Sequence, residues 1–300
     1  SSFDAAVCDS LSAYLDAGGL DNAVGFLQKI DDCLDATDQA PPVRPLLRAG
    51  LYWPDLSFVD LDAVHKQWQD GAAVAAVVFY RALMQAGDTA PVDSLIDALR
   101  LAGLNPLPLF VASLKDPESA VIVADSLQQA HADIILNLTS FAVSDASQET
   151  ADKVSLKTGT GGADMHARDR SVGPFGAVDA PVLQVILAAN RQQDWAQSSA
   201  GLTARDLAMN VALPELDGRI LSRAIGFKGA LVKHPLTHAM TTSYVADQSR
   251  VSFVAALAAR WCRLRDKPNE EKHVGFILAN YPNKDGRIAN GVGLDTPQSV

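Results

Sequence analysis

The 300-residue chain is poor in cysteine: it has only Cys8, Cys33 and Cys262, and none of them belongs to a C-x-x-C pair. An odd number of widely spaced cysteines argues against a disulfide framework and favours a reducing compartment, so we expect a cytoplasmic protein. The first residues show no basic segment followed by an apolar run, the pattern of a secretory signal. No stretch approaches the ~18 consecutive apolar residues of a membrane-spanning helix, so we expect no membrane span.

Positive charge is also scarce, with 25 Lys and Arg against 35 Asp and Glu and a net charge of −10. Proteins that bind nucleic acid usually carry a basic surplus, so we expect no nucleic-acid partner. The chain is 48% hydrophobic and 20% charged, which is ordinary for a globular protein and excludes a disordered or fibrous one.

The chain lacks the motifs of nucleotide binding and of serine hydrolysis, GxxxxGK[ST] and G-x-S-x-G. The glycine-rich stretch 158–162 lies inside a long polar segment, and we interpret it as a surface loop. Residues 290–297 hold two glycines after an expected strand and before a helix start at Thr296. They are the better phosphate-loop candidate, although a structural turn is favoured because no lysine is adjacent. We expect no tightly bound cofactor.

Apolar runs and amphipathic stretches alternate through the middle of the chain. This order of strand, helix, strand predicts a right-handed parallel α/β sheet of Rossmann-like type. The expected strands are 73–80, 106–111, 133–138 and 181–187. The expected helices between the first three strands run from Thr89 to Gly103 and over residues 117–130.

The two ends of the chain differ from this middle part. The first ~40 residues have helical periodicity, broken by Gly18-Gly19, and residues 43–70 are expected to be a connector packed on a neighbouring element. Residues 251–264 predict a helix, and residues 273–279 a further strand. Residues 144–175 are polar and glycine-rich and are expected to be the most mobile internal segment.

We therefore divide the chain into three parts. Residues 1–70 form a helical N-terminal segment with its connector, residues 71–267 an α/β domain, and residues 268–300 the start of a further α/β unit. Because that last unit stops after one strand, loop and helix start, we expect the chain to be a fragment of a larger multidomain protein.

Few side chains form a recognisable metal or catalytic group. His234 and His238 are four residues apart, the spacing of a metal pair on a helix, but Pro235 lies between them and no third ligand is near in sequence. They remain weak metal candidates. His166 lies in a charge-mixed loop and is interpreted as solvated.

Two charged groups have both a structural and a functional interpretation. Glu215 and Asp217 precede a glycine, so a turn is favoured over a cation site. The basic group Arg260, Arg263, Arg265 and Lys267 suits the negative end of a helix dipole, with an anion site as the alternative. Catalytic residues are not identifiable from these patterns.

A ligand site is instead expected from the predicted topology. In an open parallel sheet, ligands bind beyond the carboxyl ends of the strands. The loops that follow the predicted strands carry side chains able to form hydrogen bonds, and two arginines that could bind carboxylates through both nitrogens of the guanidinium fork. The candidate substrate-binding residues are Arg81, Asp88, Thr139, Ser140, Arg191 and Gln192. For both arginines, an ordinary surface ion pair is the alternative.

Four stretches of the sequence resemble the large subunits of the class I metal chelatases, a family that contains cobaltochelatase and magnesium chelatase. These stretches are residues 76–116, 133–143, 180–220, which includes ALPELDG, and 260–300. The string LANYPNKDGRIANGVGLDTP in the last stretch is similar to the cobalt branch. The resemblance covers roughly residues 50–300.

The resemblance implies a full-length protein several times longer, which binds hydrogenobyrinic acid a,c-diamide and inserts Co2+, its substrate ion, in cobalamin biosynthesis. It also implies ATP and Mg2+ used by two partner subunits of the AAA+ motor and adaptor type, which fits the absence of a P-loop here. Two alternatives stay open. One is a magnesium chelatase large subunit acting on protoporphyrin, and the other is a non-catalytic α/β ligand-binding module.

Overall fold

The computed structural model describes residues 4–45, 47–56, 59–143, 170–278, 289 and 295–299. The chain forms two compact units, Ser1–Cys262 and Arg263–Val300, which are described separately. The predicted boundaries at residues 70 and 267 stay a prediction.

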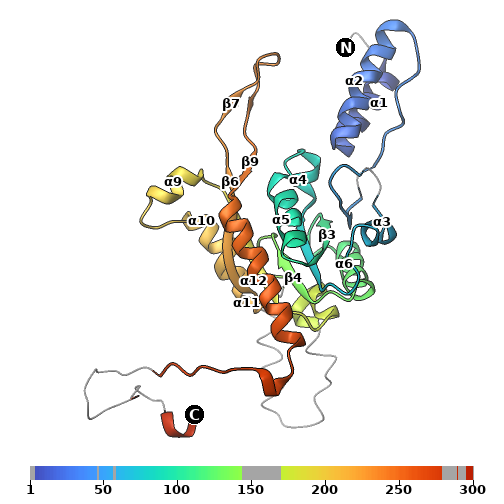
Figure 1. The fold of residues 1–300 in the computed structure, drawn as a ribbon. Helices are drawn as coiled ribbons and strands as arrows, with labels where there is room; N and C mark the ends of the chain where they lie inside the picture. Colours follow the sequence, from blue (N-terminus) through green and yellow to red (C-terminus); the bar gives the residue numbers. More distant parts are fainter. Residues whose placement is uncertain are drawn as a thin grey trace, which may run out of the picture. The chain divides into compact units, whose positions relative to one another are not determined.

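The first unit is organised around a seven-stranded sheet with the order β1-β3-β2-β4-β5-β6-β9 (Figure 1). The five central strands are parallel, whereas β1 and β9 pair antiparallel with the edges of this group. The strands are β1 (Ala49–Leu51), β2 (Val74–Tyr80), β3 (Asn105–Val111), β4 (Ile134–Asn137), β5 (Val182–Ala188), β6 (Ile220–Lys228) and β9 (Tyr244–Ala246). The four predicted strands and their parallel arrangement are confirmed.

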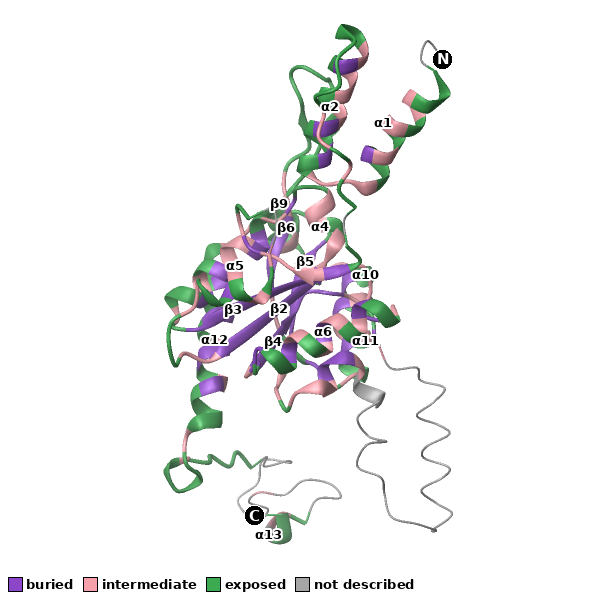
Figure 2. Ribbon diagram, turned by 90° about the vertical axis from the view of Figure 1, so that its right-hand side faces the viewer, coloured by how far each residue is buried: buried purple, intermediate pink, exposed green. Residues whose placement is uncertain are grey.

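Strands β2 and β3 are buried along almost their whole length, as expected for strands covered on both faces (Figure 2). Strand β6 is not predicted by the sequence pattern, for a physical reason. Its first four residues, Ile220–Arg223, are exposed or half-buried and include a serine and an arginine, so it shows no continuous apolar run.

Helices cover both faces of the sheet, with α5 and α12 on one face and α6, α10 and α11 on the other (Figure 2). The helices of this part are α3 (Leu61–His65), α4 (Arg81–Gln85), α5 (Ala90–Leu101), α6 (Pro117–Gln129), α9 (Gln192–Gln197), α10 (Ala204–Leu207), α11 (Leu213–Leu216) and α12 (Gln248–Asp266), with the 3-10 segment η2 (Arg170–Ala177) and the π-helical turn η3 (Ala208–Ala212). None of the helices among the described residues is long and apolar enough to cross a membrane.

The predicted N-terminal helices are present as α1 (Ala5–Ala17) and α2 (Leu20–Asp35). Gly18 and Gly19 separate them with positive φ angles of 68° and 86°, which glycine adopts without strain. The connector that follows is more ordered than expected, because β1 extends the sheet by pairing with β3 and α3 packs Val64 into the core.

The expected strand over residues 273–279 is wrong for its described part, since residues 273–278 have no regular structure. Phe276 and Ile277 are 64% and 99% exposed. An apolar run becomes a strand only where a neighbour takes up its backbone hydrogen bonds, and no pairing of these residues is seen in the described part. The helix start at Thr296 is confirmed as α13 (Thr296–Ser299). The expectations for residues 144–169, which include the glycine-rich stretch and His166, and for most of residues 290–297 lie outside the described residues.

An ion pair at the start of α6 makes the stability of the fold depend on pH. Asp116 caps this helix by accepting from the Ser119 N–H, and the Arg48 guanidinium fork donates to both its oxygens at 2.8 and 3.1 Å. Arg48 and then Ser119 lower the pKa of Asp116 from 3.8 to about 2. The stabilisation from this group is therefore complete above pH 3.8 and lost as the pH falls toward 2.

We expect Asp116→Asn to lower the midpoint of thermal unfolding by a few degrees at neutral pH and to reduce its fall in acid, because asparagine still caps the helix but cannot ionise. Circular dichroism melts across this pH range measure both effects. Asp125→Asn, at an exposed aspartate of the same helix, is the control. An equal acid response of the Asp116→Asn variant and the parent would contradict the assignment.

A buried polar network at the carboxyl ends of the central strands

The candidate site lies where the parallel sheet changes its direction of growth. Numbered in chain order, its five parallel strands follow the order 2-1-3-4-5, so the chain turns back between β2 and β4. Crevices at such switch points are the usual ligand sites of open α/β sheets. Here Tyr80 ends β2, and Asn137 ends β4 two residues before Thr139, which Ser140 follows.

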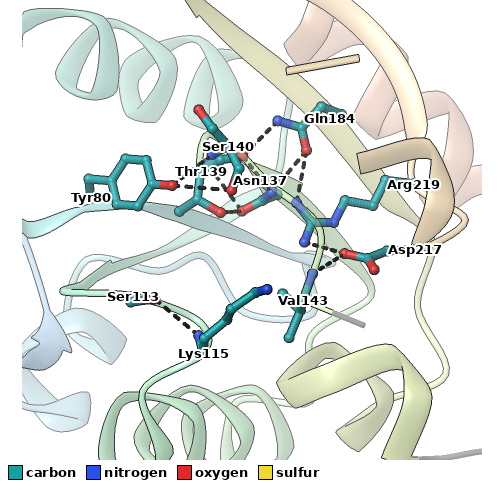
Figure 3. Close-up of polar contacts among 10 residues, drawn as sticks. All are labelled: Tyr80, Ser113, Lys115, Asn137, Thr139, Ser140, Val143, Gln184, Asp217 and Arg219. Atoms are coloured by element: carbon teal, nitrogen blue, oxygen red, sulfur yellow. Dashed lines mark hydrogen bonds and ion pairs between the residues drawn. The ribbon is translucent and has the colours of Figure 1, made fainter. Parts of the chain in front are cut away.

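Asn137, Thr139 and Gln184 form a fully buried hydrogen-bonded group (Figure 3). The Asn137 side-chain amide donates to Gln184 Oε1 at 2.9 Å, and the Gln184 amide donates to the Thr139 carbonyl at 2.8 Å. The Thr139 hydroxyl donates to Asn137 Oδ1 at 2.8 Å. Gln184 thus ties the loop after β4 to the neighbouring strand β5.

Tyr80 and Ser140 connect this loop to β2. The Ser140 N–H donates to the Tyr80 hydroxyl at 3.0 Å, and that hydroxyl donates to the Ser140 carbonyl at 3.1 Å. Burial raises the pKa of Tyr80 above 10, so at neutral pH the phenol keeps its proton and can serve as donor.

The Ser140 hydroxyl continues the network into the π-helical turn η3, where it donates to Asn210 Oδ1 at 2.6 Å. Asn210 in turn donates to Asp206, whose carboxylate also accepts from the Ala189 N–H after β5 at 3.1 Å. Pro214, near the start of the following helix α11, has no backbone N–H, so the helical hydrogen-bond pattern is interrupted directly after this turn. Single π-helical turns frequently occur at functional sites, and this one places Asn210 against the end of β4.

A buried ion pair closes the network on the other side. Arg219 donates to Asp217 at 2.7 Å, and their side chains are 1% and 2% exposed. Arg219 also donates to Gln184 at 3.3 Å and lies over the ring of Phe175, while Asp217 accepts from the Val143 N–H. Burial lowers the pKa of Arg219, and Asp217 opposes this shift. Nε of Arg219 is buried without a hydrogen-bond partner.

These contacts hold the backbone of residues 138–143 against three parts of the chain: β2, β5 and the segment between β5 and β6. Most of the donors and acceptors are used within the network, so its side chains position the loop after β4. Lys115 is exposed in the loop after β3, and its ammonium points toward Val143 and Asp217 (Figure 3). The network thus holds the backbone of the loop after β4 with little freedom to rearrange.

Two of the six predicted site residues, Thr139 and Ser140, belong to this network, but in a structural position. Asp88 lies in a second group, where it accepts from the Tyr244 N–H at 2.6 Å and from Lys228 at 3.5 Å. Burial raises the pKa of Tyr244, with Asp88 as a smaller cause.

The other three predicted residues lie at the same edge of the sheet. Arg81 begins α4 directly after β2, and Arg191 is the N-cap residue of α9 after β5. Gln192 donates to Asp247 at 2.7 Å. The carboxyl-edge placement of the loops is as expected, whereas a substrate role for the six residues stays a prediction.

The interpretation of His234 and His238 as a helical pair is wrong. They lie at the exposed end of the hairpin formed by β7 (Val232–Lys233) and β8 (Met240–Thr241), where the His238 N–H donates to the His234 carbonyl. Pro235 favours such a turn. Among the residues that the structure describes, no three His, Cys, Asp or Glu side chains gather closely enough to hold a metal ion.

The sequence favours a turn at Glu215 and Asp217, and the structure has that turn, with Gly218 at a φ of 70°. The sequence pattern does not predict the ion pair to Arg219 or the roles of Tyr80, Gln184 and Asn210. A signal is present for part of this network. Asn137 and Gln184 are polar residues within apolar strand runs, which requires each to find a partner in the core.

We expect Asp217→Ala to lower the free energy of unfolding by about 3–5 kcal/mol, because it leaves the buried Arg219 guanidinium without its carboxylate. Urea denaturation measures the change. Asp217→Ala combined with Arg219→Met removes both charges and is expected to recover part of the loss. Glu215→Ala, at an exposed position on the same turn, is the control. If Asp217→Ala were as stable as Glu215→Ala, the ion pair would have no role in folding.

Comparison with known proteins gives a consistent result. A family model described as CobN/Magnesium Chelatase matches residues 12–300. The aerobic cobaltochelatase subunits CobN of a Sinorhizobium species and of Pseudomonas aeruginosa are each 40% identical over 96% of this chain. The matched regions are 22% and 21% of those relatives, so the chain spans about a fifth of their length.

More distant relatives include the chloroplastic magnesium-chelatase subunit ChlH of Oryza sativa subsp. indica, which is 24% identical over 80% of this chain and 16% of its own length. Among solved structures, the catalytic subunit of cobaltochelatase from Mycobacterium tuberculosis matches with a TM-score of 0.65 and 28% identity, over 89% of this chain and 20% of that one. The match of the family model to nearly the whole chain, supported by these relatives, shows that the chain belongs to the CobN/magnesium chelatase family.

Proposed function

We propose that this chain is part of the large subunit of an ATP-dependent cobaltochelatase, a cytoplasmic enzyme of cobalamin biosynthesis. Its substrates are hydrogenobyrinic acid a,c-diamide and Co2+, and two AAA+ type subunits use ATP and Mg2+. The observation that carries the proposal is the identity of 40% to two CobN subunits, against 24–26% to subunits of magnesium chelatase.

The switch-point loops support a role in holding a polar macrocycle. Arg81 and Arg191 follow the carboxyl ends of β2 and β5, and a guanidinium can bind a carboxylate through two hydrogen bonds. Metal insertion itself needs a base for the pyrrole N–H protons and ligands that deliver Co2+. We place those groups outside this chain, in the remainder of the full-length subunit.

The full-length subunit, mixed with its two partner subunits and ATP, is expected to insert Co2+ into hydrogenobyrinic acid a,c-diamide, followed by the change in the visible spectrum of the corrin. The same mixture supplied with protoporphyrin and Mg2+ tests the magnesium alternative. Insertion of Mg2+ in place of Co2+ would overturn the cobalt assignment.

The 300-residue chain alone is expected to show no chelatase turnover, because it lacks a nucleotide-binding motif and the motor subunits act from separate chains. The corrin assay with ATP and Co2+ measures this directly. ATP-dependent insertion of Co2+ by this chain without partners would contradict the proposal that separate subunits use the ATP.

In the full-length subunit, Arg81→Ala combined with Arg191→Ala is expected to weaken corrin binding about tenfold or more, because two carboxylate contacts are lost. Fluorescence titration with the corrin gives the dissociation constant. Lys66→Ala combined with Arg260→Ala removes two charges from exposed positions, one at the end of α3 and one on α12, and is the control. Unchanged affinity of the Arg81/Arg191 variant would place the substrate site elsewhere in the subunit.

A further inference from the structure

The hairpin of residues 229–243, here called the arm, is an exposed extension of the sheet. It carries β7 and β8 and leaves the sheet between β6 and β9 (Figure 1). Residues 230–243 are all exposed. Its base is held firmly, because the Gly229 N–H donates to the Ser243 carbonyl at 2.8 Å and the Tyr244 N–H donates to Asp88 at 2.6 Å.

The arm combines apolar and basic side chains. Residues 218–246 contain no aspartate or glutamate, although the whole chain has 35. Lys233 pairs with Met240 across the hairpin, and Leu231 is two residues before Lys233, so these three side chains share one face. Met240 is 55% exposed, and Leu236 at the end of the arm is 84% exposed.

The N-terminal helices carry the opposite charge together with a matching apolar stripe. Residues 4–38 contain eight aspartates and a single lysine. On α2, the exposed residues Leu20, Val24, Leu27 and Leu34 lie on one helical face, and Asp31 lies among them. This acidic stripe of α2 lies on the surface of the same chain.

We propose that the arm of one copy of this chain binds the acidic stripe of α2 on a second copy, in a reciprocal two-fold dimer. Met240 and Leu231 would cover the leucines of the stripe, and Lys233 would pair with Asp31. The lengths are comparable: the 16 residues of α2 span about 24 Å, and the six residues 229–234 along one side of the arm span at most about 20 Å. A two-fold arrangement uses both surfaces of both copies and so closes the assembly.

Sedimentation velocity of the 300-residue chain over a range of micromolar concentrations tests the proposal. The expected result is a monomer–dimer equilibrium that weakens with added salt. Lys233→Glu is expected to weaken dimerisation about tenfold or more, because it places like charges opposite each other. Asp31→Lys combined with Lys233→Glu is expected to restore it.

Two controls make the result specific. Lys66→Glu makes the same charge change at an exposed position at the end of α3 and is expected to leave dimerisation unchanged. Circular dichroism checks that each variant keeps its fold, which is expected because all the substituted side chains are exposed. A monomer at every concentration, an effect of Lys66→Glu equal to that of Lys233→Glu, or failure of the charge exchange to restore the dimer would overturn the proposal.

Discussion

A buried polar side chain must find a hydrogen-bond partner within the protein, and this requirement shapes the centre of the molecule. Asn137 and Gln184 lie in neighbouring strands of a sheet covered on both faces, where water is excluded. They satisfy each other and then the backbone of Thr139. The conformation of the loop after β4 thus follows from the need to pair two amides that apolar residues could have replaced.

The same requirement explains the position of elements far apart in the sequence. Ser140 reaches Asn210, and Asp217 reaches both Val143 and Arg219. The contacts of Ser140 and Val143 link the loop after β4 to the segment between β5 and β6, which therefore packs at the carboxyl edge. A buried network in which nearly all groups are paired favours one arrangement of this loop over its alternatives.

Much of this fold could be predicted from the sequence because most apolar runs and stripes in the sequence are buried in the structure. The run 73–80 contains only apolar residues and becomes a strand covered on both faces, and Asp116 and Gly103 mark the ends of their helices. The prediction of strands failed where the apolar pattern of the sequence does not match the burial of the residues. Strand β6 is partly exposed and therefore lacks an apolar run, whereas residues 273–278 have such a run but no strand partner among the described residues.

The candidate site could be predicted only as a location. Topology places the loops after β2, β4 and β5 at one edge, and a single sequence is enough to derive that. The partner of each side chain depends on contacts between residues far apart in sequence, such as Tyr80 with Ser140 or Gln184 with Arg219. No spacing rule encodes such contacts, and the irregular register between β5 and β6 further obscures them.

The two outer strands protect the sheet unequally. β1 covers the end of β3, but β9 pairs only with the last three residues of β6, Gly226–Lys228. Within the described part of the chain, Ile220 and Leu221 pair with β5 on one side but with no strand on the outer side, and they are 39% and 50% exposed. Open edges with apolar residues promote aggregation, and an arginine on such an edge opposes it. Arg223, which lies over the Phe253 ring at 3.4 Å, occupies the position of such a gatekeeper on the open edge of β6.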